Sequence, residues 1–544
     1  MRRLTALFLL ALILCAPALG GDGELRLILV ISLDQFPQQY LERFQQHFTE
    51  GGFARLFQEG AVFTNATLKH AISVTGPGHA VLLTGCYGNR NGIVQNSWYD
   101  ATRRATINCV ADTSVMILGG QGEKRSPANL LTSTFGDQLR LHTGFQSRVV
   151  ALSLKDRGAI LMAGLLPSTV IWMGDTTFVT STYYTPSLPD WVERFNASGV
   201  IRSYFGRVWE KILPEEAYRN LGPDDAPWEA VSEGTSRTFP HTWREPSHIT
   251  PSYYDDLRSS PFGNELLASL ARAAIEGEQL GRRGVTDLLC VSFSSTDYVG
   301  HPFGPDSHEM MDMVVRTDRM LAELLAFVDD RIGLDRCIIA LSSDHGVAPI
   351  PEYLRFRMPA ARAGRISGRS LLKAATDALS SRYGEPASGE RWIDRTLGGS
   401  VHLNRRVLEQ KKLDLDEAAH VVARALQSQP GVAVAATSAE LAGAQSAGSI
   451  RERMQRSYYP GRSGDVLFVL KPFQYLSDGS TGAEHGTPYT YDTHVPLILM
   501  GPGLRPGRYA GEASPADLAP TLSALTGVEF PANREGRVLT EALR

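Results

Sequence analysis

The stretch that decides the fold is Cys337-Ile338-Ile339-Ala340-Leu341-Ser342-Ser343-Asp344-His345-Gly346. Its first five residues are apolar without a break, which is typical of a buried strand in a parallel sheet. The strand then runs directly into Asp344 and His345. Because open α/β sheets bind ligands at the carboxyl edge of their strands, a carboxylate and an imidazole at this place predict a functional site.

Other apolar strands of the chain end in the same way. We expect strands at residues 25–32 (LRLILVIS), 148–153 (RVVALS), 287–292 (DLLCVS) and 463–470 (SGDVLFVL). The residues that follow these strands are either potential metal ligands or cations. In chain order they are Asp34, then Lys155 and Arg157, then Asp297 and His301, then His485. We expect Asp297 and His301 to lie on a loop or turn, four residues apart.

Thr75 stands directly before Gly76-Pro77-Gly78 and an apolar run that ends at Gly85. Since proline suits the first turn of a helix, Thr75 is predicted at or near a helix N-terminus. Two interpretations stay open. The threonine either caps the helix, or its oxygen uses the free N–H groups and the positive helix end as an alkoxide or near a phosphoryl oxygen. Asn96 follows in a loop.

The bulk composition bounds the function classes. The chain has 544 residues, 43% of them hydrophobic, and a formal net charge of −4. This balance indicates no nucleic-acid-binding surface. We interpret residues 21–544 as one catalytic domain of α/β class, with insertions near 170–260 and 355–460. The first insertion is aromatic and rich in Ser, Thr and Pro, and we expect it to roof a pocket.

Residues 1–20 are predicted to be a secretory signal peptide. Arg2 and Arg3 precede a short apolar run, and small residues follow it at the cleavage positions. The run is too short to span a membrane, and Leu14 disfavours a lipid anchor on Cys15. The protein is therefore expected to be exported, either periplasmic or secreted. Four cysteines remain, and their three pairings stay open: Cys86, Cys109, Cys290 and Cys337.

Three aspartates and three histidines gather at the predicted strand ends and could form two groups of three: Asp34, Asp297, His301, Asp344, His345 and His485. Two-metal sites clamp the attacking and leaving oxygens of a phosphoryl transfer, and mixed nitrogen and oxygen ligands suit zinc. The other histidines, His79 among them, are expected to be surface or packing residues. His494 is a plausible neighbour of the ligands at most.

The order of these motifs resembles the alkaline phosphatase superfamily, in particular its type I phosphodiesterase/nucleotide pyrophosphatase branch and the PafA-like alkaline phosphatases. The resemblance implies a three-layer sandwich around a mostly parallel sheet, and two zinc ions. It implies that Asp34, Asp344 and His345 hold the zinc that activates Thr75, and that Asp297, His301 and His485 hold the other. Asn96, Lys155 and Arg157 match the phosphate-contacting positions.

These residues predict a phosphate monoester hydrolase that forms a phosphothreonine on Thr75 and acts on small-molecule phosphomonoesters. Two zinc ions, three aspartates and an alkoxide are together about neutral. Lys155 and Arg157 then add two positive charges, which match a monoester dianion. The alternative is a phosphodiesterase or nucleotide pyrophosphatase. A sulfatase is disfavoured because no Cys or Ser stands in the required motif, and a metal-independent binding protein would make the six ligands a coincidence. We expect a monomer.

Overall fold

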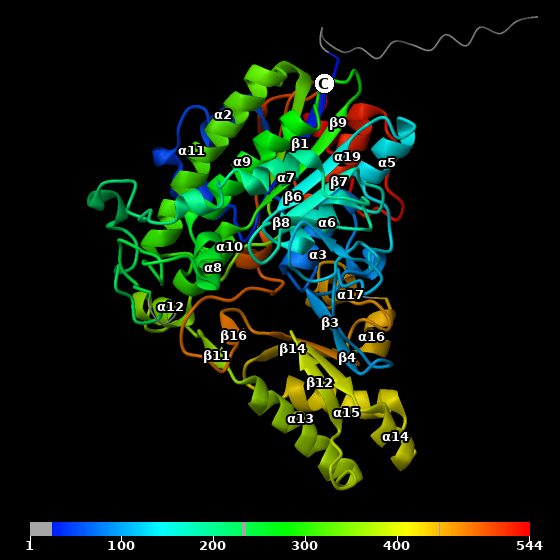
Figure 1. The fold of residues 1–544 in the computed structure, drawn as a ribbon. Helices are drawn as coiled ribbons and strands as arrows, with labels where there is room; N and C mark the ends of the chain where they lie inside the picture. Colours follow the sequence, from blue (N-terminus) through cyan, green and yellow to red (C-terminus); the bar gives the residue numbers. More distant parts are fainter. Residues whose placement is uncertain (1–23, 231–234, 445) are drawn as a thin grey trace, which may run out of the picture.

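A ten-stranded mixed sheet forms the centre of the molecule (Figure 1). The computed structural model describes residues 24–230, 235–444 and 446–544, so the predicted signal peptide lies outside the described residues. The strands, in order across the sheet, are β18 (Gly507–Tyr509), β2 (Ala61–Phe63), β17 (Leu497–Met500), β10 (Cys337–Ser342), β1 (Leu27–Leu33), β9 (Asp287–Phe293), β6 (Val149–Ser153), β7 (Thr169–Met173), β8 (Phe178–Ser181) and β5 (Ile117–Leu118).

The five central strands, β10, β1, β9, β6 and β7, are parallel. The apolar runs of β10, β1, β9 and β6 predict this arrangement, whereas β7 was not predicted as a strand. Four of them place a buried serine in register at the carboxyl end. Ser32 pairs with Ser342 on one side and with Ser292 on the other, and Ser292 pairs with Ser153. The segments that follow these four strands therefore leave the sheet at one edge.

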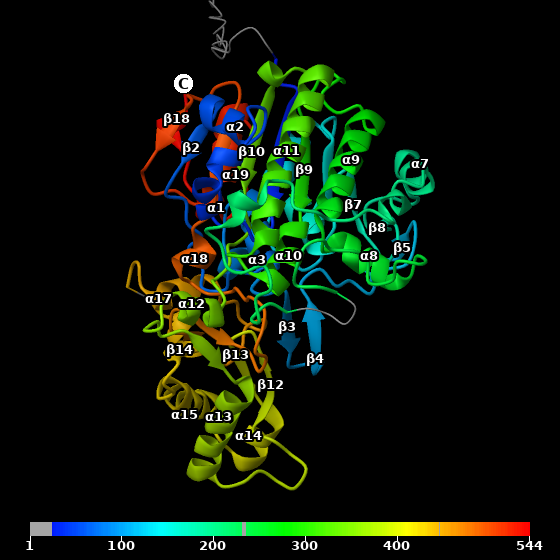
Figure 2. The ribbon, with the colours of Figure 1, turned by 90° about the vertical axis from the view of Figure 1, so that its left-hand side faces the viewer.

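Side chains of β1 alternate between two cores, which makes the architecture a three-layer α/β sandwich. Leu27, Leu29 and Ile31 point into one core with helices α2 (Phe53–Glu59), α9 (Pro261–Gly277) and α11 (His308–Arg331). Ile28 and Val30 point into the other, with α3 (Thr75–Thr84), α5 (Phe135–His142), α6 (Asp156–Ala163) and α19 (Leu518–Thr526). Figure 2 shows the first layer from outside, with α9 and α11 in front of the sheet.

Residues 364–476 form a separate layer below the carboxyl edge of the sheet, which we call the small lobe (Figures 1 and 2). Its four-stranded antiparallel sheet has the order β12 (Ile393–Leu397), β13 (Ser400–Leu403), β15 (Val466–Leu470) and β14 (Val432–Thr437). Helices α13 (Gly368–Tyr383) and α15 (Leu415–Gln427) share a core with this sheet. The strand predicted at 463–470 is present as β15, and it belongs to the small lobe rather than to the central sheet.

Residues 170–260 contain both sheet strands and covering helices. β7 and β8 complete the central sheet, whereas α7 (Asp190–Ala197) and α8 (Pro251–Arg258) pack against the core on the α9 side. Cys86, Cys109, Cys290 and Cys337 are all buried free thiols, so none of the three pairings is formed in this structure. No helix within the described residues is both long and apolar enough to cross a membrane.

Candidate metal centre and active site

The three aspartates of the predicted site all lie at the carboxyl edge of the central sheet. Asp34 directly follows β1 and Asp344 lies two residues beyond β10, and neither side chain is accessible to solvent. Asp297 lies on helix α10 (Ser295–Phe303), which begins two residues after β9. The prediction of a loop or turn for Asp297 and His301 was wrong. Their spacing of four residues places them on one face of that helix.

The structure brings the six predicted ligands together. Asp297, His301 and His485 form one group in which ligand atoms lie within 4.8 Å of one another. His345 Nε2 lies 3.5 Å from Asp34 Oδ1 and 3.4 Å from Asp344 Oδ2, so these three residues form the second group. We call these the exposed-side group and the buried group. Asp34, Asp297 and His345 also lie within 4.8 Å of one another, so the two groups are adjacent.

The three histidine rings are oriented in the same way by the backbone. Nδ1 lies 2.9 Å from the Gly346 carbonyl oxygen in His345, 3.0 Å from that of Ala483 in His301, and 2.9 Å from that of Ser73 in His485. A carbonyl oxygen only accepts, so each Nδ1 carries the proton and each neutral ring presents an unprotonated Nε2. Metal-binding histidines typically have this second hydrogen bond, because it sets the tautomer and orients the ring.

The donor set fits divalent cations. Asp34 Oδ1 and His345 Nε2 are both buried, have no hydrogen-bond partner among the described residues, and face each other at 3.5 Å. Two acceptors in this arrangement are unfavourable unless a cation lies between them. Burial and the neighbouring Asp344 raise the pKa of Asp34 well above its ordinary value, which shows the same unfavourable crowding of negative charge.

Thr75 is the first residue of α3, and the preceding cap position is taken by Val74. The threonine is therefore not the capping residue of its helix, which removes one of the two interpretations. Gly78 lets the first turn of α3 approach the site closely, because a Cβ at this position would lie only 2.1 Å from the Asp344 backbone oxygen. Asn96 Oδ1 accepts a hydrogen bond of 2.6 Å from the Gly76 N–H, so Asn96 lies beside the same turn.

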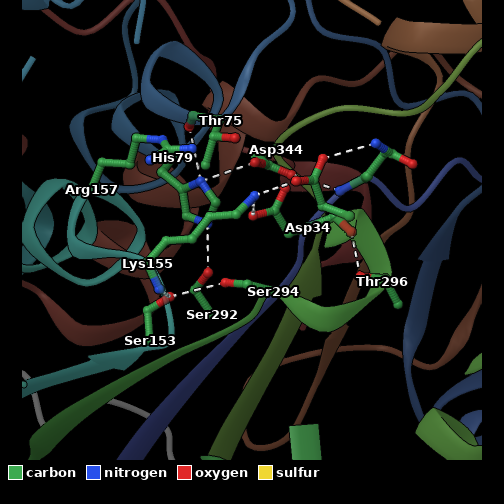
Figure 3. A network of polar contacts seen from close by, with 12 residues as sticks. Asp34, Thr75, His79, Ser153, Lys155, Arg157, Ser292, Ser294, Thr296 and Asp344 are labelled. Atoms are coloured by element: carbon green, nitrogen blue, oxygen red, sulfur yellow. Dashed lines mark hydrogen bonds and ion pairs between the residues drawn. The ribbon is translucent and has the colours of Figure 1, made fainter. Parts of the chain in front are cut away.

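Lys155 connects the two groups of ligands, and Figure 3 shows its side chain beside Asp34 of the buried group. Its Nζ lies 2.7 Å from Asp34 Oδ2 and 2.5 Å from Asp297 Oδ2, and the residue is only 4% exposed. Burial by itself would lower the pKa of Lys155, but Asp297 and Asp34 outweigh this and raise it. The positive charge of Lys155, which was predicted to contact the substrate, is thus paired with the carboxylates of Asp34 and Asp297 in this structure. Arg157 is half-buried in the first turn of α6. Unlike Lys155 Nζ, its Nε has no hydrogen-bond partner among the described residues.

Two further residues of the site were missed by the sequence analysis. His79, which was expected to be a surface or packing residue, is fully buried, with Nδ1 2.9 Å from the Thr75 carbonyl oxygen and 3.0 Å from Asp344 Oδ2. Its Nε2 lies 2.7 Å from Ser292 Oγ (Figure 3). The position of His79, one helical turn after Thr75, was the available signal, because residues i and i+4 share a face.

Gln35 is the second missed residue. Its Nε2 donates to Asp297 Oδ1 at 2.8 Å, and its backbone N–H donates to Asp344 Oδ1 at 3.2 Å. One residue thereby contacts an aspartate of each group. The backbone of Gln35 lies in the left-handed region, with φ of 57°, a conformation that residues other than glycine rarely adopt. Such local strain is characteristic of functional sites. A glutamine after a strand-end aspartate gives no comparable signal in the sequence.

A buried group of aspartates and histidines at the carboxyl edge of this α/β sandwich defines an alkaline-phosphatase-like protein. The chain belongs to the type I phosphodiesterase/nucleotide pyrophosphatase family, whose model matches residues 28–494.

Among its relatives, the alkaline phosphatase PhoV of Synechococcus elongatus is 34% identical over 95% of this chain and 93% of that protein. The alkaline phosphatase PafA of Elizabethkingia meningoseptica is 33% identical over 95% and 94%. The crystal structure of wild-type PafA matches with a TM-score of 0.90, at 33% identity, over 96% of this chain and 100% of that one. A PafA variant in which one Thr, one Asn, one Lys and one Arg are replaced matches with a TM-score of 0.88, at 32% identity.

Proposed function

We propose that the protein is a zinc-dependent alkaline phosphatase, which hydrolyses phosphate monoesters through a phosphothreonine on Thr75. The observation that carries this proposal is the position of Thr75 at the start of α3, within one helical turn of a histidine that contacts Asp344. The full-length similarity to PhoV and PafA, both named as alkaline phosphatases, supports the same activity.

We propose that Asp34, Asp344 and His345 hold one zinc ion, and that Asp297, His301 and His485 hold the other. When bound, two zinc ions lower the pKa of a coordinated hydroxyl and neutralise charge on the attacking and leaving oxygens. The protein contributes ligands with fixed tautomers, through the three Nδ1 contacts to backbone carbonyls. It also buries Asp34 and Asp344 completely, which strengthens their electrostatic interactions.

In the proposed reaction, the Thr75 oxygen attacks phosphorus in line with the ester oxygen, and the alcohol leaves as the phosphothreonine forms. Water then cleaves the phosphothreonine and restores the hydroxyl. The partial positive charge at the N-terminus of α3 would stabilise the negative charge that develops on the phosphoryl oxygens during the reaction. Asn96, whose oxygen already accepts from the Gly76 N–H, keeps its amide N–H₂ available as a donor to the phosphoryl group.

Lys155 and Arg157 are the reason that we prefer a monoesterase. Both stand at the start of α6, the first buried beside Asp34 and Asp297 and the second half-buried. A monoester dianion gains from two cations, whereas a diester monoanion does not need both, and arginine can grip two phosphoryl oxygens at once. The PafA variant replaces the same four residue types, with its Lys and Arg also two positions apart.

The experiment that tests this function compares kcat/KM for p-nitrophenyl phosphate and bis-p-nitrophenyl phosphate at alkaline pH with zinc. The wild type is expected to prefer the monoester strongly. The double variant Lys155→Ala/Arg157→Ala is expected to lose most of this preference, by roughly two orders of magnitude, because each lost charge-assisted contact costs about 1.5–3 kcal/mol. A preference for the diester that the double variant leaves unchanged would instead identify a phosphodiesterase.

We further propose that the mature protein acts as a monomer outside the cytoplasm, periplasmic or secreted, on small-molecule phosphomonoesters. The signal-peptide pattern of residues 1–20 supports export. Fractionation of the native host, followed by N-terminal sequencing of the mature chain, tests this localisation. A chain that retains residues 1–20 in the cytoplasm would contradict it.

A further inference from the structure

A cavity of about 280 Å³ separates the small lobe from the site. One wall comes from the small lobe, in the loop between β12 and β13, at the end of β15, and in β16 (Gln474–Leu476). The other comes from the segments 71–74 and 484–487 and from Gln95. The two walls are tied together beside the cavity, since Gln95 Nε2 donates to the Gly398 carbonyl oxygen at 2.7 Å.

Three residues of the cavity lining adjoin the reacting centre. Val74, Gln95 and His485 all line the cavity. Val74 directly precedes Thr75, Gln95 directly precedes Asn96, and His485 belongs to the exposed-side group of ligands. In the proposed function the ester oxygen is received by the exposed-side group, and His485 is the ligand of that group that also lines the cavity. The carbon skeleton attached to this oxygen then has the cavity as the adjacent space.

The lining selects the chemistry of what enters. Ile72, Val74, Phe468 and Leu470 supply apolar surface, Gln95, Gln474 and Thr487 supply uncharged polar groups, and no lysine or arginine lines the cavity. Its one acidic residue is Glu484. Further phosphate or carboxylate groups would meet no cation there, whereas an apolar body would be removed from water by aromatic and aliphatic side chains. Its volume is ample, because a cavity of about 150 Å³ holds a benzene-sized group.

We propose that this cavity is the subsite for the organic part of a phosphomonoester, and that it favours uncharged apolar groups, aryl or alkyl, over anionic ones. The inference rests on the proposed function, because it needs the phosphoryl group to lie between Thr75 and His485. It extends that function by giving the small lobe a role in substrate selection.

The test uses three primary alkyl phosphates whose leaving alcohols differ only in the distal group: ethyl, 2-phenylethyl and 2-carboxyethyl phosphate. In the wild type, kcat/KM for 2-phenylethyl phosphate is expected to exceed that for ethyl phosphate by about tenfold, the discrimination typical of an apolar pocket. The 2-carboxyethyl ester is expected to be the poorest of the three. Phe468→Ala is expected to remove most of the phenyl preference while inhibition by inorganic phosphate stays unchanged.

Two further variants keep the test interpretable. Phe145→Ala truncates an exposed phenylalanine near the start of β6, at the opposite edge of the sheet, and is expected to keep the preference. Leu476→Ala removes a cavity side chain that is 37% exposed, so it serves where Phe468→Ala fails to fold. Equal kcat/KM for the ethyl and phenylethyl esters, or a phenyl preference that survives both cavity variants, overturns the subsite. If the wild type hydrolyses none of the three esters, the proposed monoesterase function is overturned instead.

Discussion

The buried group and the exposed-side group contain the same kinds of ligand atom but are built differently. Asp34, Asp344 and His345 come from the ends of neighbouring parallel strands and are all completely buried. Asp297 and His301 come from a helix and His485 from a loop, and the His301 side chain is 39% exposed. From this comparison we expect adjacent groups of candidate metal ligands to differ in rigidity, because the ligands of one follow directly from sheet strands, whereas those of the other come from a helix and a loop.

The largest expected difference is in the effect of removing one ligand. Asp344→Ala is expected to lower kcat/KM for p-nitrophenyl phosphate by at least about 10³-fold, because bulk solvent has no access to its fully buried position to replace the lost ligand. His301→Ala is expected to cost roughly 10–100-fold, since solvent can replace an exposed ligand.

The measurement combines kcat/KM at saturating zinc with the zinc content per chain. His420→Ala, at a partly exposed position of α15 in the small lobe, is the matched control and is expected to match the wild type. If His301→Ala lost as much activity as Asp344→Ala, the proposed difference in rigidity between the two groups would be wrong.

The next difference concerns pH. Burial lowers the pKa of His301, but Asp297 and Glu484 outweigh this and raise it to about 9, whereas burial lowers the pKa of His345. Zinc must displace a proton from His301 below pH 9 but not from His345. Zinc affinity of the exposed-side group should therefore fall roughly tenfold per pH unit below about 9, or about 100-fold between pH 9 and pH 7. In the buried group, His345 adds no such slope, because burial lowers its pKa.

Titration with zinc buffered by a chelator at pH 7, 8 and 9 resolves the two affinities. In His301→Gln, which cannot bind a proton at this position, the slope of the exposed-side group should disappear. A slope of that group that His301→Gln leaves unchanged would contradict the assignment of the proton to His301.

The smallest expected effects come from the two residues that hold the ligands. Gln35→Ala removes the hydrogen bond to Asp297, and His79→Ala removes the contact to Asp344. Each is expected to weaken zinc binding about 10–100-fold, at the exposed-side group for Gln35 and at the buried group for His79. The two variants are controls for each other in the same chelator titration. A variant that weakened both sites equally would indicate a general loss of structure rather than a positioning role.

Several parts of the site could be predicted because their signals are local in the chain. Asp34, Asp344 and His345 follow uninterrupted apolar runs, and such runs become parallel strands whose ends meet at one edge. Thr75 precedes a Gly-Pro-Gly helix start. The helical placement of Asp297 and His301 was not foreseen, since Gly300 and Pro302 disfavour a helix, and the contacts of α10 with the rest of the fold outweigh that local preference.

The sequence by itself determined the α/β class, four parallel strands of the central sheet (β1, β6, β9 and β10) and the six residues that now stand together at its edge. Only the tertiary structure decided that Lys155 bridges both groups, that His79 and Gln35 contact the aspartates, and that the small lobe forms a cavity with Val74 and His485. The physical reason is the distance along the chain between the residues that interact. Hydrophobic periodicity is set by neighbours along the chain, whereas Gln35 and Asp344 are 309 positions apart, and their contact exists only after the strands have paired.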